Sequence, residues 1–347
     1  MDTTLQAETS AAHQLKRALT GAGFAPLNET GWIRITGSDR VRWLNGMLTN
    51  SIQALGPGQG CYNLALNSQG RIQGDASVFA PPDDPNALLI ETERSQLERL
   101  MTHLDHFVIM DDVELSDVTA ERSGLLLVGT KAVETLRKLQ LSALDEPLAI
   151  TAGGWNGERI TIIRALSPLV PRLELWTDFA TAEKFMASLP SETARLSPET
   201  LEYLRVLEGT PRYGVDIRDT DKAHDLPQET TPVGAESRAL HFSKGCYLGQ
   251  EIVERIRSRG NVHRIFSGFQ LTGAVPSAGT QLQAEGKPAG ELTSVAVVPF
   301  PGRAVQLALG YVRREALDRK LTLEYPGGTA LPVALPFRNA LGSLTDI

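Results

Sequence analysis

The order of strand and helix patterns along the chain constrains its fold most strongly. Residues 32–35 predict a short strand, which is followed by the apolar spacing of an amphipathic helix. Strand patterns on both sides of a turn at 67–70, a second amphipathic helix over 97–107 and a last strand pattern complete this unit. A similar order returns in residues 123–188, without enough identity to define a sequence repeat. Each unit favours an antiparallel sheet that is covered by helices.

The segments after these units predict one more helix and then an all-β region. Ser197 and Pro198 stand in favoured cap and first-turn positions of a helix, and Gly209 lies just past its end. Apolar and polar or small residues alternate over 305–311, which is the pattern of a half-buried strand. Because short strand patterns between Gly and Pro turns fill residues 265–337, we predict a small β-barrel or sandwich there.

Composition excludes several classes of protein. Lys and Arg number 34 against 41 Asp and Glu, a net charge of −7, so we expect no direct nucleic-acid binding and only local attraction to anions. No apolar run approaches the roughly 20 residues of a membrane helix, and the acidic N-terminus is unlike a secretory signal. Two cysteines are too few for a four-cysteine metal site, so we expect no resident metal and a reducing, cytoplasmic location.

The most informative short motif is "FSKGCYLGQE", residues 242–251, which contains Cys246. A free cysteine is often simply buried. Here Lys244 and downstream arginines would stabilise a thiolate, and Gly245 and Gly249 would let the loop bend sharply. Both interpretations, a reactive thiol and a silent one, follow from the residues. The other cysteine, Cys61, lacks such neighbours and is interpreted as structural.

Other polar groups have two interpretations each. The arginines at 255, 257, 259 and 264 suit either a solvated face or an anion site. Asp75 follows a turn and faces either solvent or a cleft between sheet and helix. His103 and His106 have the spacing of a metal pair on a helix, but no third ligand is visible, so surface histidines are preferred.

The stretch "KGCYLGQEIVER" resembles the Lys-Gly-Cys-Tyr-x-Gly-Gln-Glu signature of the YgfZ family, folate-binding proteins that support iron–sulfur cluster assembly or repair. Its wider superfamily includes the aminomethyltransferase, or T-protein, of the glycine cleavage system. "IRITGSDRVRWLNGMLTN", "LNSQGRIQGDASVF", "YLRVLEGTPRYGVD" and "GELTSVAVVPF…ALGYVRR" are similar to other parts of the family, so the likeness spans nearly the whole chain. The cysteine motif is its specific part.

The resemblance implies an α+β fold with two ferredoxin-like lobes of antiparallel sheets and a small C-terminal β-barrel around a central folate-binding channel. We expect the lobes in residues 1–262, with a boundary near 115–125 that allows for discontinuous lobes, and the barrel in residues 263–347. The implied ligand is tetrahydrofolate or a one-carbon derivative. The implied partners are iron–sulfur proteins, some of which modify tRNA, or assembly factors.

The resemblance also implies site residues. Cys246 and Lys244 would carry the thiol chemistry. The residues that would bind folate are Asp75, Arg205, Glu208, Tyr247, Gln250, Glu251 and Arg255. A pterin needs a carboxylate at its amino-pyrimidine edge, and the glutamate tail of folate needs cations.

Two positions depart from the T-protein pattern. Where the T-protein hairpin carries two adjacent aspartates, this chain has Gly74 and then Asp75. The acidic residue expected in the pocket helix falls opposite Leu207, with Glu208 one position later. A helix turns about 100° per residue, so Glu208 need not face the pocket. Both departures are expected to weaken aminomethyl transfer more than folate binding.

These observations lead to one preferred function and two alternatives. The preferred function is a folate-binding accessory protein for iron–sulfur cluster assembly or repair, in which Cys246 attacks a disulfide or a one-carbon group or touches iron. The sequence leaves open whether the protein turns over a substrate. The alternatives are a folate-dependent aminomethyltransferase or demethylase, and a non-catalytic interaction protein with a vestigial pocket. Folate titration distinguishes the last from the others.

Overall fold

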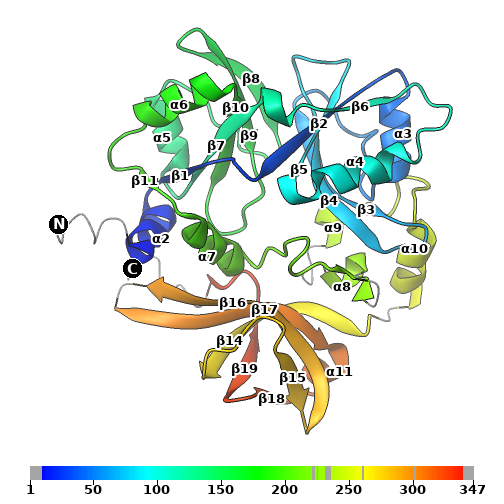
Figure 1. Cartoon of the computed structure of the whole chain (residues 1–347), viewed down its shortest axis with the longest axis vertical. Coiled ribbons are helices and arrows are strands. Elements are labelled where there is room, and N and C mark those ends of the chain that lie inside the picture. Colours follow the sequence, from blue (N-terminus) through cyan, green and yellow to red (C-terminus); the bar gives the residue numbers. More distant parts are fainter. Residues whose placement is uncertain are drawn as a thin grey trace.

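The computed structural model describes residues 10–220, 223–224, 226–230, 236–259, 262–300 and 302–338. Two helix-covered sheets lie side by side, and a closed β-barrel lies below them (Figure 1). Helix α7 (Pro198–Glu208) and the short helix α8 (Pro227–Thr230) lie between the sheets and the barrel (Figure 1). In the described part of the chain, no helix has the length and apolar character needed to cross a membrane.

The first lobe contains a five-stranded antiparallel sheet in the order β3-β4-β5-β2-β6. Its strands are β2 (Thr30–Thr36), β3 (Gln59–Leu66), β4 (Ile72–Ala80), β5 (Leu88–Glu93) and β6 (Glu114–Asp117). The helices that belong to it are α3 (Arg40–Met47) and α4 (Leu97–Asp105). Ile33 and Ile35 pack in one cluster with Leu44 and Leu100 of these helices, whereas Trp32, directly before Ile33 in the chain, lies in a different cluster. This alternation buries both faces of the sheet.

The second lobe contains a six-stranded sheet in the order β11-β1-β7-β10-β9-β8. Its strands are β1 (Gly23–Pro26), β7 (Ser123–Val128), β8 (Ile150–Trp155), β9 (Glu158–Arg164), β10 (Arg172–Thr177) and β11 (Ala194–Arg195). The helices of this part of the chain are α2 (Ala11–Thr20), α5 (Ala132–Lys138) and α6 (Phe179–Ser188). Neighbouring strands are antiparallel except β1 and β11. Because β1 precedes the whole first lobe in sequence, the second lobe is assembled from discontinuous segments.

The two sheets meet face to face through aromatic side chains. Trp176 of β10 contacts Trp32 and Phe79 of the first lobe in edge-to-face geometry, with ring centroids 5.8 and 5.3 Å apart. Edge-to-face ring pairs stabilise a fold by more than the burial of their apolar area alone. This contact joins the two lobes into one core.

The connecting helix and the barrel match the predictions from the sequence. The Ser197 hydroxyl caps α7 by accepting a hydrogen bond from the Thr200 amide, and Gly209 ends the helix in the left-handed conformation at φ 70°. The barrel closes in the order β14-β17-β16-β15-β18-β19. Its strands are β14 (Arg264–Gly273), β15 (Gln281–Ala284), β16 (Lys287–Phe300), β17 (Arg303–Arg313), β18 (Leu323–Tyr325) and β19 (Gly328–Val333). The predicted mixed fold of antiparallel sheets and a small C-terminal barrel is therefore confirmed.

Candidate functional site

Two adjoining cavities, of about 470 and 670 Å³, are lined by residues of both lobes and of the segment after α7. Leu335 and Pro336, just after the last barrel strand, also line the smaller one. Cavities of a few hundred to a thousand Å³ are typical of small-molecule sites. The residues that line both cavities are Asp75, Leu166, Arg172, Glu208, Thr210 and Pro211. The two spaces thus form one candidate site that contains Asp75 and Glu208.

Asp75 is held in this site by a preorganised set of donors. Alternation along β4 places it on the face opposite Gly74. The Tyr62 hydroxyl donates to its Oδ2 at 2.6 Å, and the Gln96 amide donates to its Oδ1 at 2.7 Å. Burial raises the pKa of the Asp75 carboxyl, although both hydrogen bonds favour its charged form. A ligand that donates hydrogen bonds to this carboxylate would offset the free-energy cost of burying its charge.

Gly74, where the sequence departs from the T-protein pattern, is not among the described residues that line the cavities. A Cβ at position 74 would meet Gln96 Oε1 at 3.1 Å and Leu100 Cδ1 at 3.4 Å, on the side of the sheet covered by α4. A carboxylate at 74 would therefore be crowded against α4 and would not enter the cavity. Asp75, in contrast, lines the cavity, so the expectation that this departure weakens aminomethyl transfer more than folate binding stays a prediction.

Glu208 also lines the site, although the sequence left its direction open. Leu207 is fully buried in the core, and Glu208, one position later on the helix, lines both cavities. The Ser167 hydroxyl donates to Glu208 Oε1, and burial raises the pKa of the carboxyl. The single-residue offset at 207 and 208 therefore leaves a carboxylate in the site.

A polar cluster in the smaller cavity escaped the sequence analysis. Glu91 of β5 and Glu174 of β10 share a hydrogen bond across the two lobes, and Arg172 forms a 3.0 Å ion pair with Glu174. The Trp176 indole also donates to Glu174 at 3.2 Å. Burial and the neighbouring Glu174 raise the pKa of Glu91 well above its usual value, whereas Arg172 lowers the pKa of Glu174 against its burial. The signal for this cluster was a glutamate between apolar residues in "RLELWT", a polar group in a buried strand.

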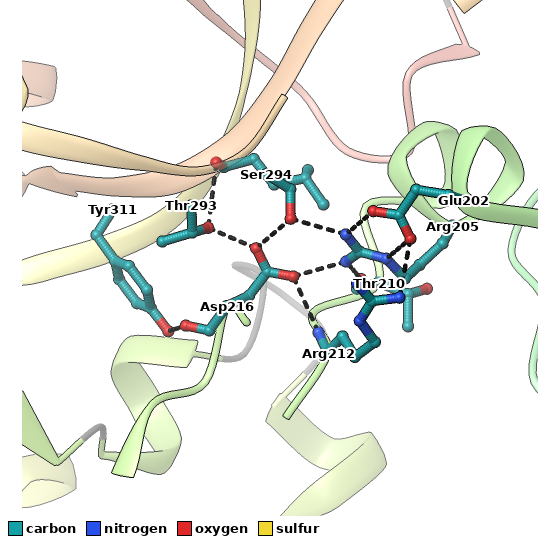
Figure 2. Close-up of polar contacts among 9 residues, drawn as sticks. Glu202, Arg205, Thr210, Arg212, Asp216, Thr293, Ser294 and Tyr311 are labelled. Atoms are coloured by element: carbon teal, nitrogen blue, oxygen red, sulfur yellow. Dashed lines mark hydrogen bonds and ion pairs between the residues drawn. The ribbon is translucent and has the colours of Figure 1, made fainter. Parts of the chain in front are cut away.

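Arg205 is committed to a network that fixes the cavity wall (Figure 2). Its guanidinium donates to Asp216, Glu202, Ser294 and the Thr210 carbonyl, at distances of 2.6 to 2.7 Å for its terminal nitrogens. Figure 2 shows this network between α7, the segment after it and the barrel strands. Arg205 also lines the larger cavity, where these bonds hold its guanidinium in the wall.

The cysteine motif forms an exposed loop followed by helix α10 (Gln250–Arg259). Cys246 is exposed on this loop. Gly245 and Gly249 have φ values of 94° and 80°, which confirms the sharp bends expected at the two glycines. A Cβ at Gly249 would meet the Asn67 carbonyl oxygen at 2.5 Å, so only glycine lets the loop approach the β3–β4 turn so closely.

Lys244 makes contacts other than those expected at Cys246. Its ammonium donates to the carbonyls of Leu48 and Asn50, the first at 2.6 Å, and lies over the Tyr247 ring at 5.2 Å from the centroid. Its charge lowers the pKa of the Cys61 thiol, against the larger effect of burial. Burial lowers the pKa of Lys244 to about 8. Its described contacts therefore tie the motif loop to the first lobe.

The remaining motif residues divide between wall and surface. Tyr247 is buried in a cluster with Leu64, Ile217 and Ala239, which also line the smaller cavity. The Gln250 side chain accepts from the Tyr247 amide at 3.3 Å. Glu251 and Arg255 pair with each other at 2.6 Å on the exposed side of α10. Neither is among the described residues that line the two cavities.

The combined geometry is that of an acidic, partly apolar pocket. An exposed thiol, Cys246, lies next in the chain to Tyr247, which packs against residues that line this pocket. The smaller cavity contains Asp75, Glu91, Glu174 and Glu208 with Arg172 as the paired cation. Such a pocket suits a ligand with several N–H donors and a flat apolar body. Within the described ranges, no group of three or more His, Cys, Asp or Glu side chains is arranged to hold a metal ion.

Comparisons with known proteins agree with this architecture. Residues 4–156 match the family described as GCVT N-terminal domain, and residues 264–338 match CAF17, C-terminal beta-barrel domain. The solved structure of glycine cleavage system aminomethyltransferase T from Bartonella henselae has a TM-score of 0.77 at 19% identity and covers 94% of this chain and 89% of that chain. This similarity supports the fold.

Relatives of two kinds are similar in sequence. An aminomethyltransferase of Thermotoga maritima is 24% identical over 95% of this chain and 90% of its own length, and one of Rubrobacter xylanophilus is 28% identical over 94% and 85%. A mitochondrial iron–sulfur cluster assembly factor IBA57 homolog of Pyricularia oryzae is 27% identical over 70% of this chain and 56% of that protein. The two family matches therefore make residues 4–156 similar to a GCVT N-terminal domain and residues 264–338 similar to a C-terminal β-barrel domain of the CAF17 type.

Proposed function

We propose that the protein binds tetrahydrofolate or a one-carbon derivative in the cavity lined by Asp75 and Glu208. We further propose that it supports the assembly or repair of iron–sulfur clusters through Cys246. The observation that carries the folate proposal is that both carboxylates line the same two adjoining cavities. The positions at which the sequence departs from the T-protein pattern do not remove either carboxylate from this lining.

The chemistry of the pocket fits a pterin. The amino-pyrimidine edge carries adjacent N–H donors, and a carboxylate accepts two such bonds at once. Tyr62 and Gln96 fix the orientation of the Asp75 carboxylate before a ligand arrives. Arg238 and Arg212, which line the smaller and the larger cavity, supply cations for a glutamate tail. When bound, the folate would supply the one-carbon chemistry, and these residues would bind and orient it.

The surface position of Cys246 supports a role toward a protein partner. The thiol is exposed, and the cluster of Tyr247, Leu64 and Ala239 stands between its loop and the smaller cavity. A partner could therefore approach the thiol while the cavity is occupied. The CAF17 type of the barrel and the relative named as an iron–sulfur cluster assembly factor support this role. A cytoplasmic location and client enzymes that modify tRNA belong to the same proposal.

Calorimetric titration with tetrahydrofolate tests the pocket. We expect saturable one-site binding by the wild type. Asp75→Asn and Glu208→Gln keep the shape of the side chains but remove their charge, and each should weaken the Kd by roughly 10- to 100-fold, since hydrogen bonds to charged groups contribute about 1.5–3 kcal/mol. Glu183→Gln, on the exposed face of α6, is the matched control and should bind like the wild type. Absence of binding by the folded wild type would favour the vestigial pocket, and unchanged binding by both pocket variants would place the pterin elsewhere.

Complementation tests the thiol separately. Cells that lack this protein should recover iron–sulfur enzyme activity with the wild type and with Cys61→Ala, but not with Cys246→Ala. Purified Cys246→Ala should still bind tetrahydrofolate, because Cys246 is not among the described residues of the cavity lining. Full recovery with Cys246→Ala would overturn the role of the thiol and leave folate binding standing.

Aminomethyl transfer is a second candidate because the hairpin carboxylate Asp75 remains in the cavity. Relatives named aminomethyltransferase also match nearly the full chain. The assay is the formation of methylenetetrahydrofolate from an aminomethyl donor. If this candidate is correct, Asp75→Asn abolishes turnover and Cys246→Ala leaves it unchanged.

A further inference from the structure

A third cavity, of about 300 Å³, lies between the two lobes and shares no described lining residue with the two cavities above. Its first-lobe wall comes from β2, from the turn between β4 and β5 and from the segment before β7. Its second-lobe wall comes from β9, β10 and the start of α6. Three arginines, Arg34, Arg122 and Arg159, meet in this lining.

Two of these arginines are already paired. Arg34 binds Asp84 at 2.7 Å, and Arg159 forms an ion pair with Asp83. The Arg122 guanidinium, in contrast, makes no hydrogen bond or close ion pair with any residue in the described ranges. The cavity therefore contains one arginine whose charge has no direct partner there.

The surroundings of Arg122 make this charge costly. Burial lowers the pKa of Arg122, and the charges of Arg159 and Arg34 lower it further, against the opposing effect of Glu121 and Asp83. A half-buried cation with like-charged neighbours is stabilised by any anion that reaches it. The guanidinium remains charged at neutral pH because the ordinary pKa of arginine lies far above neutrality.

We infer that this inter-lobe cavity binds a small molecule through a single phosphate or carboxylate group, with Arg122 as the principal ligand. A guanidinium fork matches both oxyanions in bidentate geometry. The Thr161 hydroxyl, which also lines the cavity, makes no hydrogen bond to a described residue and can donate to the same group.

The acidic residues of the lining restrict the ligand. Asp83, Asp84, Glu121 and Asp178 stand around the three arginines, so the site repels polyanions and accepts one oxyanion group. Asp178 is engaged at the N-terminus of α6, where it accepts from the Thr181 amide at 2.9 Å. A cavity of about 300 Å³ is at the small end of ligand sites, which suits a small metabolite or free phosphate.

Thermal unfolding in phosphate tests the site. The melting temperature of the wild type is measured against inorganic phosphate at constant ionic strength, which is balanced with chloride. We expect a saturable rise, because a ligand that binds only the native state stabilises it by mass action. Arg122→Gln should raise the half-saturating phosphate concentration at least tenfold. Arg137→Gln, which removes an exposed arginine near the end of α5, should titrate like the wild type.

Two further measurements separate binding from a structural role and identify the oxyanion. In phosphate-free buffer, Arg122→Gln should melt at the same temperature as the wild type or higher, because it removes an unpaired charge; a structural arginine would lower the melting temperature on removal. Acetate in place of phosphate reports whether a single carboxylate is preferred. A flat phosphate and acetate response in the wild type, or an equal response in Arg122→Gln, would overturn the inference. Tetrahydrofolate binding by Arg122→Gln should be unchanged, so this test is independent of the proposed folate site.

Discussion

The two free thiols of the chain occupy opposite environments. Cys246 is exposed on the motif loop, whereas Cys61 is half-buried on β3. The Asn63 amide donates to the Cys61 sulfur at 3.2 Å, and burial raises the pKa of Cys61 to about 11 despite the nearby charge of Lys244. Because the thiolate is the reactive form, we expect Cys61 to react slowly at neutral pH. We expect Cys246 to be the more reactive thiol because it is the exposed one.

We therefore predict site-selective alkylation. Iodoacetamide at pH 7.5 should modify Cys246 in the native protein and leave Cys61 unmodified, as measured by peptide mass spectrometry over time. Raising the pH should speed modification at Cys61 by up to tenfold per unit toward its pKa of about 11, provided that the fold persists. In denaturant, both cysteines should react. Comparable native rates at the two sites, or a protected Cys246, would contradict this assignment.

At the scale of elements, the segment that follows α7 is fixed by one buried carboxylate. Asp216 is fully buried and accepts from Arg205, the Arg212 amide, Thr293 and Ser294, and its carbonyl accepts from Tyr311 at 3.0 Å. These partners belong to α7, to the segment itself and to barrel strands β16 and β17 (Figure 2). Thr210 and Ile217 of the same segment line the smaller cavity. The barrel thus acts on the candidate site through Asp216.

Asp216→Ala should lower the free energy of unfolding by about 3–5 kcal/mol, because it leaves the buried Arg205 charge without one of its partners. Denaturant titration measures the change. Amide hydrogen exchange should also rise over 210–217 more than in the first-lobe sheet. The control is Asp318→Ala, since its exposed pair with Arg314 at 3.7 Å should change stability by less than about 0.5 kcal/mol. A loss as small as that of the control would mean that the network does not hold the segment.

The elements were more predictable than the directions of their side chains. Helix α7 is predictable because Ser197, Pro198 and Gly209 are local signals that act within a few residues. The barrel is predictable because alternation repeats along every strand. The direction of Glu208 is not, because a one-residue offset on a helix becomes meaningful only when Leu207 is seen in the core. The Glu91–Glu174 pair was missed because its members lie on strands of different lobes. No local pattern in either strand indicates that the two side chains are in contact.

At the scale of the whole molecule, the two lobes share an aromatic contact region. Trp176 of the second lobe is almost fully buried against Trp32 and Phe79 of the first. Glu91 of the first sheet and Glu174 of the second, which share a hydrogen bond between the lobes, line the smaller cavity. Since the lobes share this core, we expect the wild type to unfold them together. The sequence predicted the two sheets but not this contact, because face-to-face packing of lobes leaves no periodic signal along the chain.

Trp176→Ala tests this coupling. The substitution should cost about 3–5 kcal/mol, the usual range for truncating a buried aromatic residue, and should split the calorimetric transition of the two lobes into two. The matched control is Trp155→Ala, because Trp155 packs within the second lobe against Phe185, at a ring-centroid distance of 4.9 Å. That variant should be destabilised without separating the lobes, because it leaves the contact of Trp176 with Trp32 and Phe79 intact. A single transition in Trp176→Ala, or an equal splitting in Trp155→Ala, would show that the lobes are coupled elsewhere. If the splitting occurs as expected, ligands of either inter-lobe cavity should restore a single transition, since each cavity is lined by residues from both lobes.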